Sequence, residues 1–291
     1  MYTGSFVALI TPFTNGEIDE NSFQSLVDRQ VKEGTNGVVP CGTTGESPTL
    51  SHTEHKRVTE LCIEVVNGRI PVMAGAGSNS TSEAIELAKH AESAGADSVL
   101  VVAPYYNKPT QAGLYAHYKA INDAIGIPII VYNIPGRSVV NVDVDTMKRL
   151  FKLPNIVGVK DATGDLALPI SVKKELGPEF CQLSGEDATA VVHLAAGGNG
   201  CISVTANLVP ARCAAQHQAW GKGDFIGAMA IQDELIDLHN AMFCEASPGP
   251  VKYAAELMGL CNAEMRLPMV EISETSKATV KTALFELGLI S

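Results

Sequence analysis

The chain has 291 residues, of which 46% are hydrophobic and 18% charged, and its formal net charge at pH 7 is −11. This size suits one large α/β domain or two ordinary domains, and the apolar content indicates a globular chain rather than a disordered one. The negative charge argues against nucleic acid as a partner, because a phosphate-binding surface needs clustered lysine and arginine side chains.

The first apolar run, Phe6 to Ile10, is too short for a membrane span, and no basic segment of the kind that opens a signal peptide precedes it. We therefore expect a cytoplasmic protein without membrane contact. Seven cysteines are scattered along the chain and never form a CxxC spacing. This distribution predicts reduced thiols rather than disulfides or a zinc site.

Eight apolar runs of β type follow one another along the chain, with helical patterns between them. Each repeat accommodates one strand, one crossover helix and two short loops. Because the runs are continuously apolar and do not alternate, they predict parallel strands buried on both faces. The predicted fold is therefore a TIM (β/α)8 barrel, with a doubly wound open sheet as the alternative. The runs are FVALIT, GVVPCG, IPVMAG, SVLVVAP, IPIIVYN, IVGVKDA, CQLSGE and CISVTAN.

Helix start and stop signals flank the intervening segments. Asp19 precedes the first helical pattern, hydroxyl residues at 80–82 precede EAIELAKHAESAG, and Gly34, Gly95 and Gly126 follow helical patterns as breakers.

From about Val209 onward the chain has only helical patterns. We expect residues 1–224 to form the barrel and residues 225–291 to form a small C-terminal helical extension that packs on it.

One lysine stands at the end of a predicted strand. A TIM barrel carries its active site at the carboxyl ends of its strands, and Lys160 ends the apolar run in NIVGVKDATGD. Burial disfavours a charged amine, and a lysine that acts at neutral pH needs a pKa of about 7 to 8 instead of about 10.4. A neutral lysine forms Schiff bases with ketones. The alternative that the residues alone leave open is an ion pair with Asp161 or another acid.

Three further strand-end features have both a functional and a structural interpretation. Tyr132 ends the preceding strand, where it can relay protons or only pack. The loop GTTGES, residues 42–47, offers backbone N–H and hydroxyl groups to a carboxylate or phosphate, or only leads into the next helix. Arg137 suits a bidentate carboxylate contact, or is a solvated loop charge.

Two motifs have part of the pattern of a cofactor site. His52 and His55 have a metal-ligand spacing, but no third ligand is evident, so no metal is predicted. The glycine-rich AAGGNG follows a helical pattern instead of a strand, so no dinucleotide cofactor is predicted.

Six segments in order closely resemble the dihydrodipicolinate synthase family, within the class I pyruvate-dependent aldolases and lyases. The similarity covers essentially the whole chain, from TGSFVALITPF to RLPMVEIS and beyond. The segments are GTTGES, PYYNKPTQ, YNIPGRS, GVKDATGD, LSGED and GCISVTAN.

This resemblance implies a Schiff-base-forming carbon–oxygen lyase that condenses pyruvate with L-aspartate-4-semialdehyde, the first committed step of the diaminopimelate and lysine pathway. Lys160 would form the imine with pyruvate. Tyr106 would reach into a neighbouring subunit's site, so a homotetramer built as a dimer of dimers is expected. The other implied roles are proton relay by Tyr132, Thr43 and Tyr106, pyruvate carboxylate binding by Thr43 and Thr44, semialdehyde binding by Arg137, and lining by the backbone of Gly185 and Ile202.

Arg137 favours this reaction within the family, because an arginine matches an anionic aldehyde. Relatives of the N-acetylneuraminate lyase and 4-hydroxy-2-oxoglutarate aldolase types do not use an arginine there. A related aldolase of these types is one alternative. A non-catalytic barrel that binds an amino acid is the other.

The resemblance also implies feedback inhibition by L-lysine, bound by groups that suit the charges of an amino acid. Tyr105 adjoins Tyr106, which offers a route for coupling. The implied effector residues are Ser47, His52, His55, Asn79, Glu83 and Tyr105. Departures from the family pattern occur at Pro48, Ser138, Val139, Ser247 and Gly249.

Overall fold

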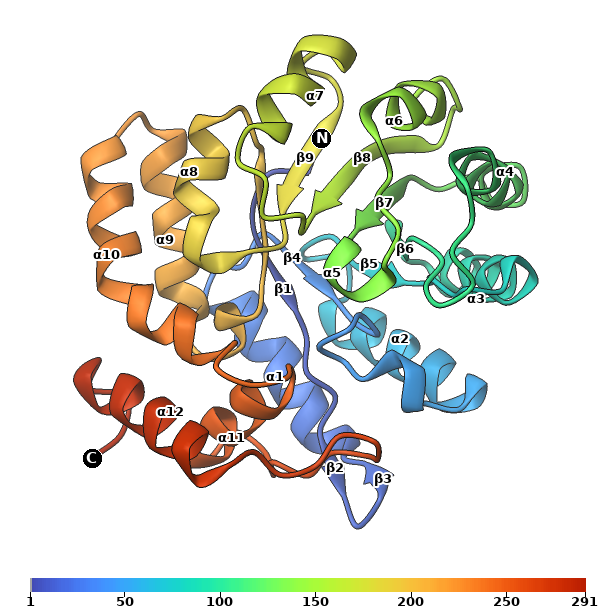
Figure 1. Cartoon of the computed structure of the whole chain (residues 1–291). Coiled ribbons are helices and arrows are strands. Elements are labelled where there is room, and N and C mark those ends of the chain that lie inside the picture. Colours follow the sequence, from blue (N-terminus) through green and yellow to red (C-terminus); the bar gives the residue numbers. More distant parts are fainter. Residues whose placement is uncertain (1) are drawn as a thin grey trace. The chain divides into compact units, whose positions relative to one another are not determined.

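The computed structural model describes residues 2–291. Each of its eight main strands (Figure 1) overlaps one of the eight predicted runs. These strands form one sheet in the order β4-β1-β10-β9-β8-β7-β6-β5. The strands neighbour one another in chain order, with the last strand β10 beside the first strand β1, which distinguishes a (β/α)8 barrel from a doubly wound sheet; the prediction of a TIM barrel is confirmed. The strands are β1 Gly4–Ala8, β4 Gly37–Val39, β5 Met73–Gly75, β6 Ser98–Val102, β7 Ile129–Asn133, β8 Ile156–Asp161, β9 Cys181–Ser184 and β10 Gly200–Ser203.

Two compact units make up the described chain. The first holds Pro71–Ile202 with the first residues of the chain, and the second holds Gly4–Ile70 and Ser203–Ser291. The division at residue 224, expected from the sequence, stays a prediction.

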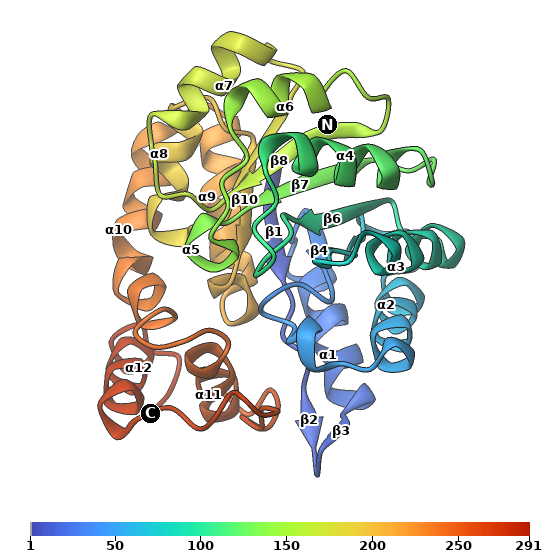
Figure 2. The ribbon, with the colours of Figure 1, turned by 45° about the vertical axis from the view of Figure 1, so that its right-hand side comes forward.

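In the first unit, helices α3, α4, α6 and α7 pack successively against one another (Figure 2). The five residues of β7 are all buried, as expected for a strand covered on both faces. The helical elements of this unit are α3 Thr81–Ala94, α4 Gln111–Asn122, α5 Pro135–Ser138, α6 Val144–Leu150, α7 Leu168–Leu176, the 3₁₀ helix η2 Asp187–Thr189 and α8 Ala190–Ala195.

The predicted helix stops differ in their accuracy. Gly95 caps α3 with a φ of +97°, as a C-terminal glycine commonly does. Gly126 does not end α4, which stops at Asn122. Instead the N–H of Gly126 donates to the Glu92 carboxylate in the following loop, at 2.7 Å.

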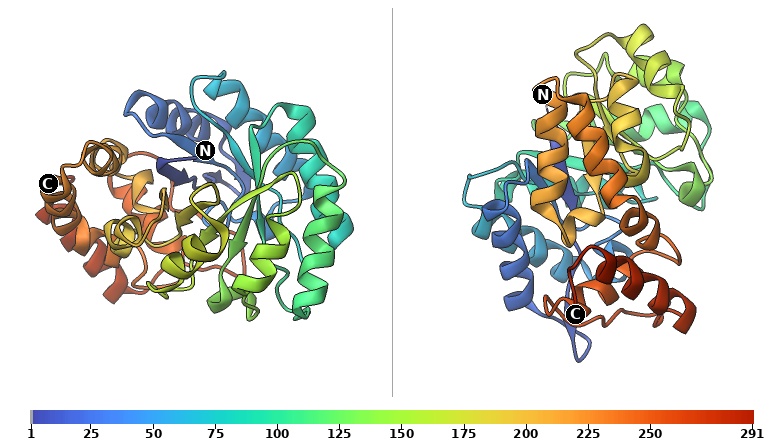
Figure 3. Two further views of the ribbon diagram at one scale, coloured as in Figure 1. Left: turned by 90° about the horizontal axis from the view of Figure 1, so that it is seen from above. Right: turned by 90° about the vertical axis from the view of Figure 1, so that its left-hand side faces the viewer.

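In the second unit, the helical patterns expected after Val209 form α9, α10, α11 and α12, and α9 and α10 lie side by side (Figure 3). Asp19 caps α1 as predicted, because its carboxylate accepts the Ser22 N–H at 3.0 Å. No helix within residues 2–291 is long and apolar enough to span a membrane. The helical elements are α1 Glu20–Lys32, η1 Ser47–Thr49, α2 His52–Val66, η3 Thr205–Asn207, α9 Pro210–Gly221, α10 Phe225–Ala241, α11 Gly249–Leu257 and α12 Glu274–Glu286.

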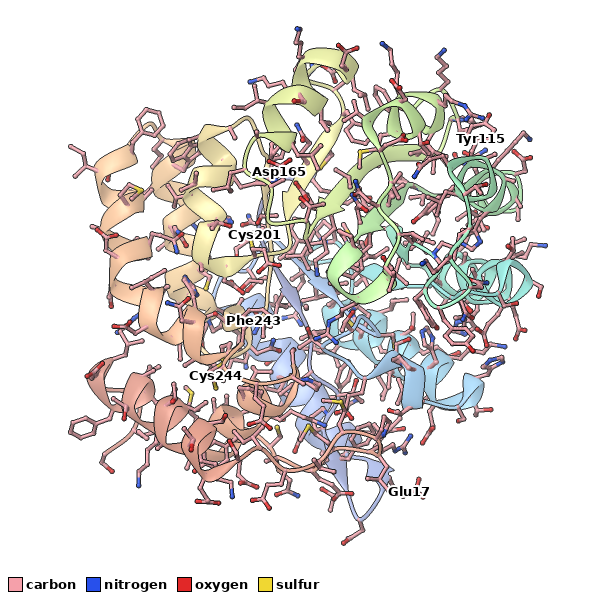
Figure 4. The ribbon with its side chains drawn as sticks, in the orientation of Figure 1. Glu17, Tyr115, Asp165, Cys201, Phe243 and Cys244 are labelled. Carbon is pink, nitrogen blue, oxygen red and sulfur yellow. The ribbon has the colours of Figure 1, made fainter. Side chains whose placement is uncertain are left out.

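A short hairpin that the sequence analysis did not predict precedes α1. Its strands are β2 (Phe13–Thr14) and β3 (Glu17–Ile18), and Glu17 is labelled near its tip in Figure 4. The turn residues Asn15 and Gly16 both have positive φ, as tight hairpin turns require. Their N–H groups donate to the carboxylate of Glu264, at 2.8 and 2.6 Å.

Arg266 ties the C-terminal segment to this hairpin and to α2. Its guanidinium donates to the Gly16 carbonyl at 2.7 Å and forms a bidentate pair with the Glu54 carboxylate, at 2.9 and 2.5 Å. Glu54 also closes a capping box with Ser51 at the start of α2. The arginine contact, followed by the Ser51 hydrogen bonds, outweighs burial and lowers the pKa of Glu54 to about 2.

Replacing Glu54 tests how much this pair stabilises the fold. The carboxyl has a pKa of about 2 when folded against an ordinary value of 4.5, so its contribution is complete above the ordinary value and is lost as the pH falls toward 2. We expect Glu54→Gln to lower the free energy of unfolding at pH 7 by on the order of 2 kcal/mol, after screening by solvent.

Urea unfolding of both proteins between pH 7 and pH 2.5 measures this difference, which should shrink on acidification. Glu64→Gln, at an exposed acid of the same helix, is the control and should have a smaller effect. A wild-type advantage that is equal at pH 3 and pH 7 would contradict the assignment.

Candidate functional site

Lys160 stands at the carboxyl end of β8, beside Tyr132 of β7. The two residues are register partners in the parallel pair, and the Lys160 Nζ lies 4.4 Å from the centre of the Tyr132 ring. Both residues are buried, each with 6% of its surface exposed. The structure therefore brings the predicted nucleophile and the predicted phenol into direct contact.

Asp161, the next residue, is directed to other partners. One carboxylate oxygen accepts the N–H and the hydroxyl of Thr163, at 3.0 and 2.7 Å. The other oxygen lies 3.9 Å from the Nε2 of His193, a buried side chain on α8. Asp161 is therefore not the ion-pair partner that the sequence analysis left open for Lys160.

Gly185 follows β9 and leaves space for the lysine side chain. A Cβ at this position would lie 2.8 Å from the Ala162 Cβ and 3.1 Å from the Lys160 Cε. The Gly185 N–H donates to the Asp161 carbonyl at 2.6 Å, which holds the glycine next to β8. A side chain at residue 185 would therefore displace the lysine or its neighbours.

Arg137 lies exposed on α5, in the loop after β7. The two departures beside it have clear structural consequences. The hydroxyl oxygen of Ser138 lies 2.9 Å from the carbonyl oxygens of both Ile134 and Val140, and its one proton is shared between these two acceptors, which closes the loop. Val139 adopts a φ of +66°, which is strained for a β-branched residue.

Glu186 is an acid that the sequence analysis did not single out. It is half-buried in the loop after β9, where the Ser184 hydroxyl accepts its N–H at 3.0 Å. Burial, followed by the Asp187 carboxylate, raises its pKa, whereas the positive charges of Lys160 and Arg137 act in the opposite direction. The carboxyl group of Glu186 is therefore within the electrostatic range of both Lys160 and Arg137.

In the GTTGES loop, several backbone N–H groups are already hydrogen-bonded within the turn. The N–H groups of Gly45, Glu46 and Ser47 donate to carbonyls within the loop, and the Thr11 hydroxyl donates to the Gly45 carbonyl at 2.8 Å. We therefore expect an anion at this loop to be bound by Thr43, which is half-buried, and Thr44, which is buried.

Tyr106 is held in an exposed and unusual conformation after β6. Its side chain is 88% exposed and its φ is +71°. Its neighbour Tyr105 is half-buried, and the Asn107 amide donates to the Asn79 carbonyl at 2.9 Å. Glu83 accepts a hydrogen bond from Ser78 in the same unit. The predicted effector residues Asn79 and Tyr105 thus lie on two adjoining loops, and Glu83 lies in the first turn of α3, directly after one of them.

The other predicted effector residues lie in the second unit, on η1 and α2. Ser47 opens η1, and Pro48 fits there because the first turn of a helix needs few N–H donors. His52 is exposed at the first position of α2, whereas His55 is buried. Residues 2–291 contain no group of three or more histidine, cysteine, aspartate or glutamate side chains placed for a metal ion.

The remaining predicted residue, Ile202, is fully buried on β10.

Sequence reasoning missed Glu186 and His193. The LSGED segment contains this acid, but nothing in the sequence shows that the acid comes within the electrostatic range of two cations. His193 had no signal, because a single histidine in a short apolar helix is usually a core residue.

A family model and the curated relatives both match this chain to the same protein family. The model of the Dihydrodipicolinate synthetase family matches residues 1–287. The chain is 62% identical over 291 residues to the 4-hydroxy-tetrahydrodipicolinate synthase of Rhodospirillum centenum, and the match covers 100% of both chains.

Solved structures agree over the whole length. The chloride-inhibited dihydrodipicolinate synthase from Acinetobacter baumannii, complexed with pyruvate, has a TM-score of 0.97 and 44% identity, and the match covers 100% of both chains. DHDPS from Cyanidioschyzon merolae with lysine bound has a TM-score of 0.96 and 36% identity, and the match covers 99% of both chains.

The close approach of Gly185 to Lys160 can be tested by adding one methyl group. We expect Gly185→Ala to slow borohydride trapping of pyruvate on Lys160 by about ten- to a hundredfold, because the new Cβ misplaces the amine. Peptide mass spectrometry after reduction measures the adduct. Gly221→Ala is the control, since nothing lies within 4 Å of a Cβ there. Equal trapping rates in both variants would show that Lys160 tolerates the methyl group.

Proposed function

Because this chain belongs to the dihydrodipicolinate synthetase family, we propose that it condenses pyruvate with L-aspartate-4-semialdehyde through an imine on Lys160. The synthase activity itself is supported by 62% identity to a synthase over the full chain. One observation carries the assignment of the nucleophile: the buried amine of Lys160 lies against the Tyr132 ring at the end of β8.

The chemistry begins with attack of the Lys160 amine on the keto carbon of pyruvate and loss of water. The methyl group is adjacent to the resulting protonated imine, which accepts the electron pair of a broken C–H bond, so a methyl proton can leave and an enamine forms. The enamine carbon attacks the aldehyde of the second substrate. The amino group of that substrate then closes the ring at the imine carbon, and Lys160 leaves as the free amine.

Each of these steps moves a proton, and the proposed carriers have hydroxyl groups. Tyr132 is the phenol in contact with the lysine, which supports its role as the first carrier. Thr43 and Tyr106 are assigned to the relay by the family resemblance. Thr43 and Thr44 are also the proposed donors to the pyruvate carboxylate, with the backbone of Gly185 and Ile202 lining the site.

The charges near Lys160 favour an aldehyde with both a carboxylate and an ammonium group. Arg137 is suited to the carboxylate. Glu186, which carries the opposite charge and is within the electrostatic range of Arg137, is suited to the ammonium group. Aspartate semialdehyde has both groups, whereas a sugar acid or a hydroxy-oxoglutarate offers no ammonium group. This pairing supports the synthase over the aldolase alternatives.

We further propose a homotetramer in which Tyr106 of one subunit completes the site of another, working in the cytoplasm. The almost complete exposure of Tyr106 in a left-handed conformation supports this role, because a large aromatic side chain is seldom presented in this way without a partner.

Inhibition by L-lysine is proposed from the six effector residues of the family pattern. A relative at 36% identity has lysine bound, which supports a lysine site in this family. The side chains include an acid and histidines, which suit the ammonium and carboxylate groups of an amino acid.

Trapping with borohydride tests the nucleophile and the second substrate together. The protein is reduced in the presence of pyruvate, with and without aspartate semialdehyde, and product formation is followed in parallel. We expect a reduced adduct on Lys160 that is depleted when the semialdehyde is present, because condensation consumes the enamine. Lys160→Met should abolish both the adduct and the product.

The control is Lys148→Met, at an exposed lysine that pairs with Glu175 on the surface. An adduct on Lys160 without product from the semialdehyde, together with cleavage of a sugar acid or a hydroxy-oxoglutarate to pyruvate, would replace the synthase with an aldolase. The absence of any adduct on Lys160 in wild type would leave only the non-catalytic, amino-acid-binding alternative.

A histidine substitution tests the lysine site. We expect His52→Ala to raise the lysine concentration for half-maximal inhibition about tenfold, the loss of one hydrogen bond to a charged ligand. Initial rates against lysine concentration measure this shift. Thr53→Ala, at the neighbouring exposed position of α2, is the control. Identical inhibition curves for both variants would remove His52 from the site.

A further inference from the structure

Lys252 is a lysine that the proposed chemistry does not use, although its side chain is completely buried. It lies on α11 and is 0% exposed, and its Nζ donates to the Glu46 carboxylate at 2.5 Å and to the Glu264 carbonyl at 2.6 Å. The same ammonium group lies 4.3 Å from the centre of the Phe13 ring. It therefore has an anion, a carbonyl and an aromatic face around it.

The partner of this lysine belongs to the GTTGES loop. Glu46 is buried, with 3% of its surface exposed, and follows Thr43 and Thr44 by three and two residues. Its second carboxylate oxygen accepts the N–H of Arg266 at 3.1 Å. Both oxygens of one loop carboxylate are thus held by the C-terminal part of the chain.

The backbone of Glu46 explains why the loop needs such an anchor. Its φ is +54°, in the left-handed region that a residue with a side chain rarely adopts. The Glu46 N–H donates to the Thr43 carbonyl at 3.1 Å, so this conformation directly sets the path of the chain at the two threonines. Strain of this kind persists only when surrounding contacts enforce it.

General stability is a poor reason for the pair. Two buried charges lose their hydration, and well-packed apolar side chains of similar volume usually stabilise a fold equally well. A buried ion pair does fix the position of its charged groups, because the carboxylate must meet its hydrogen-bond donors at one place. The pair therefore serves to position the Glu46 side chain more than to stabilise the fold.

We propose that Lys252 is a positioning residue for the substrate loop: through Glu46 it holds Thr43 and Thr44 in the conformation that binds the pyruvate carboxylate. This inference rests on the proposed function, which assigns the two threonines to pyruvate. In this proposal the C-terminal helical extension helps to shape the active site, because the Glu46 side chain links Lys252 of the extension to the threonine loop.

Two variants separate this role from simple stability. Lys252→Met keeps the length of the side chain and removes its charge, which leaves the Glu46 carboxylate buried without its main partner. Glu46→Gln is milder, because the amide oxygen can still accept the lysine hydrogen bond. Arg57→Met is the matched control, since it breaks a surface pair with Glu20 in the same unit.

The readouts are steady-state kinetics, hydrogen exchange and borohydride trapping, all on the full chain and below the unfolding transition of each variant. For Lys252→Met we expect the KM for pyruvate to rise at least about tenfold with a much smaller change for the semialdehyde, slower trapping of pyruvate on Lys160, and faster amide exchange in residues 39–50. Glu46→Gln should show the same pattern with smaller changes, and Arg57→Met should behave like wild type.

Three outcomes decide the matter. Unchanged pyruvate KM and unchanged exchange in a folded Lys252→Met variant would overturn the proposal. If that variant does not fold, Glu46→Gln decides in the same way: a lower unfolding temperature without a change in pyruvate KM would show that the pair is only structural. Absence of an adduct on Lys160 in the wild-type protein would instead refute the proposed function, so the two failures are distinguishable.

Discussion

The parallel register of β7, β8 and β9 is the constraint on which the site depends. Lys160 is the register partner of Tyr132 on one side and of Leu183 on the other. Because successive side chains of a strand point to opposite faces, the same register directs Asp161 away, to Thr163 and His193. A slip by one residue would exchange the amine and the carboxylate. The position of Lys160 at the end of β8 therefore depends on this register as much as on the burial of the strand.

The loops after the strands carry the strained backbone of the molecule. Several residues other than glycine have positive φ there, and they adjoin the candidate site residues: Cys41 and Glu46 flank the threonine loop, Tyr106 and Lys108 lie in the loop after β6, and Val139 follows Arg137. Such conformations persist only where surrounding contacts enforce them, as the ion pair with Lys252 does for Glu46. The rigid sheet thus supports loops whose shapes are set by specific polar contacts.

The strands could be predicted because each is a continuous apolar run between turn residues, and the strand-end residues followed from the fold class. Features without such a pattern could not. The hairpin β2–β3 has strands of two residues, which are too short to show a period. Gly126 resembled a helix stop, but α4 ends earlier at Asn122. Glu186 became notable only when the fold placed its carboxyl group near two cations.

By itself, the sequence determined the (β/α)8 architecture, the family and the lysine at the end of β8, because these depend on local apolar patterns and on short motifs. Only the tertiary structure decided which charged side chains pair with one another. It directed Asp161 to Thr163 and His193 instead of Lys160, and it joined Lys252 to Glu46 across 206 positions of the chain. An ion pair between distant residues leaves no periodic trace in a sequence, since its geometry exists only after the chain has folded.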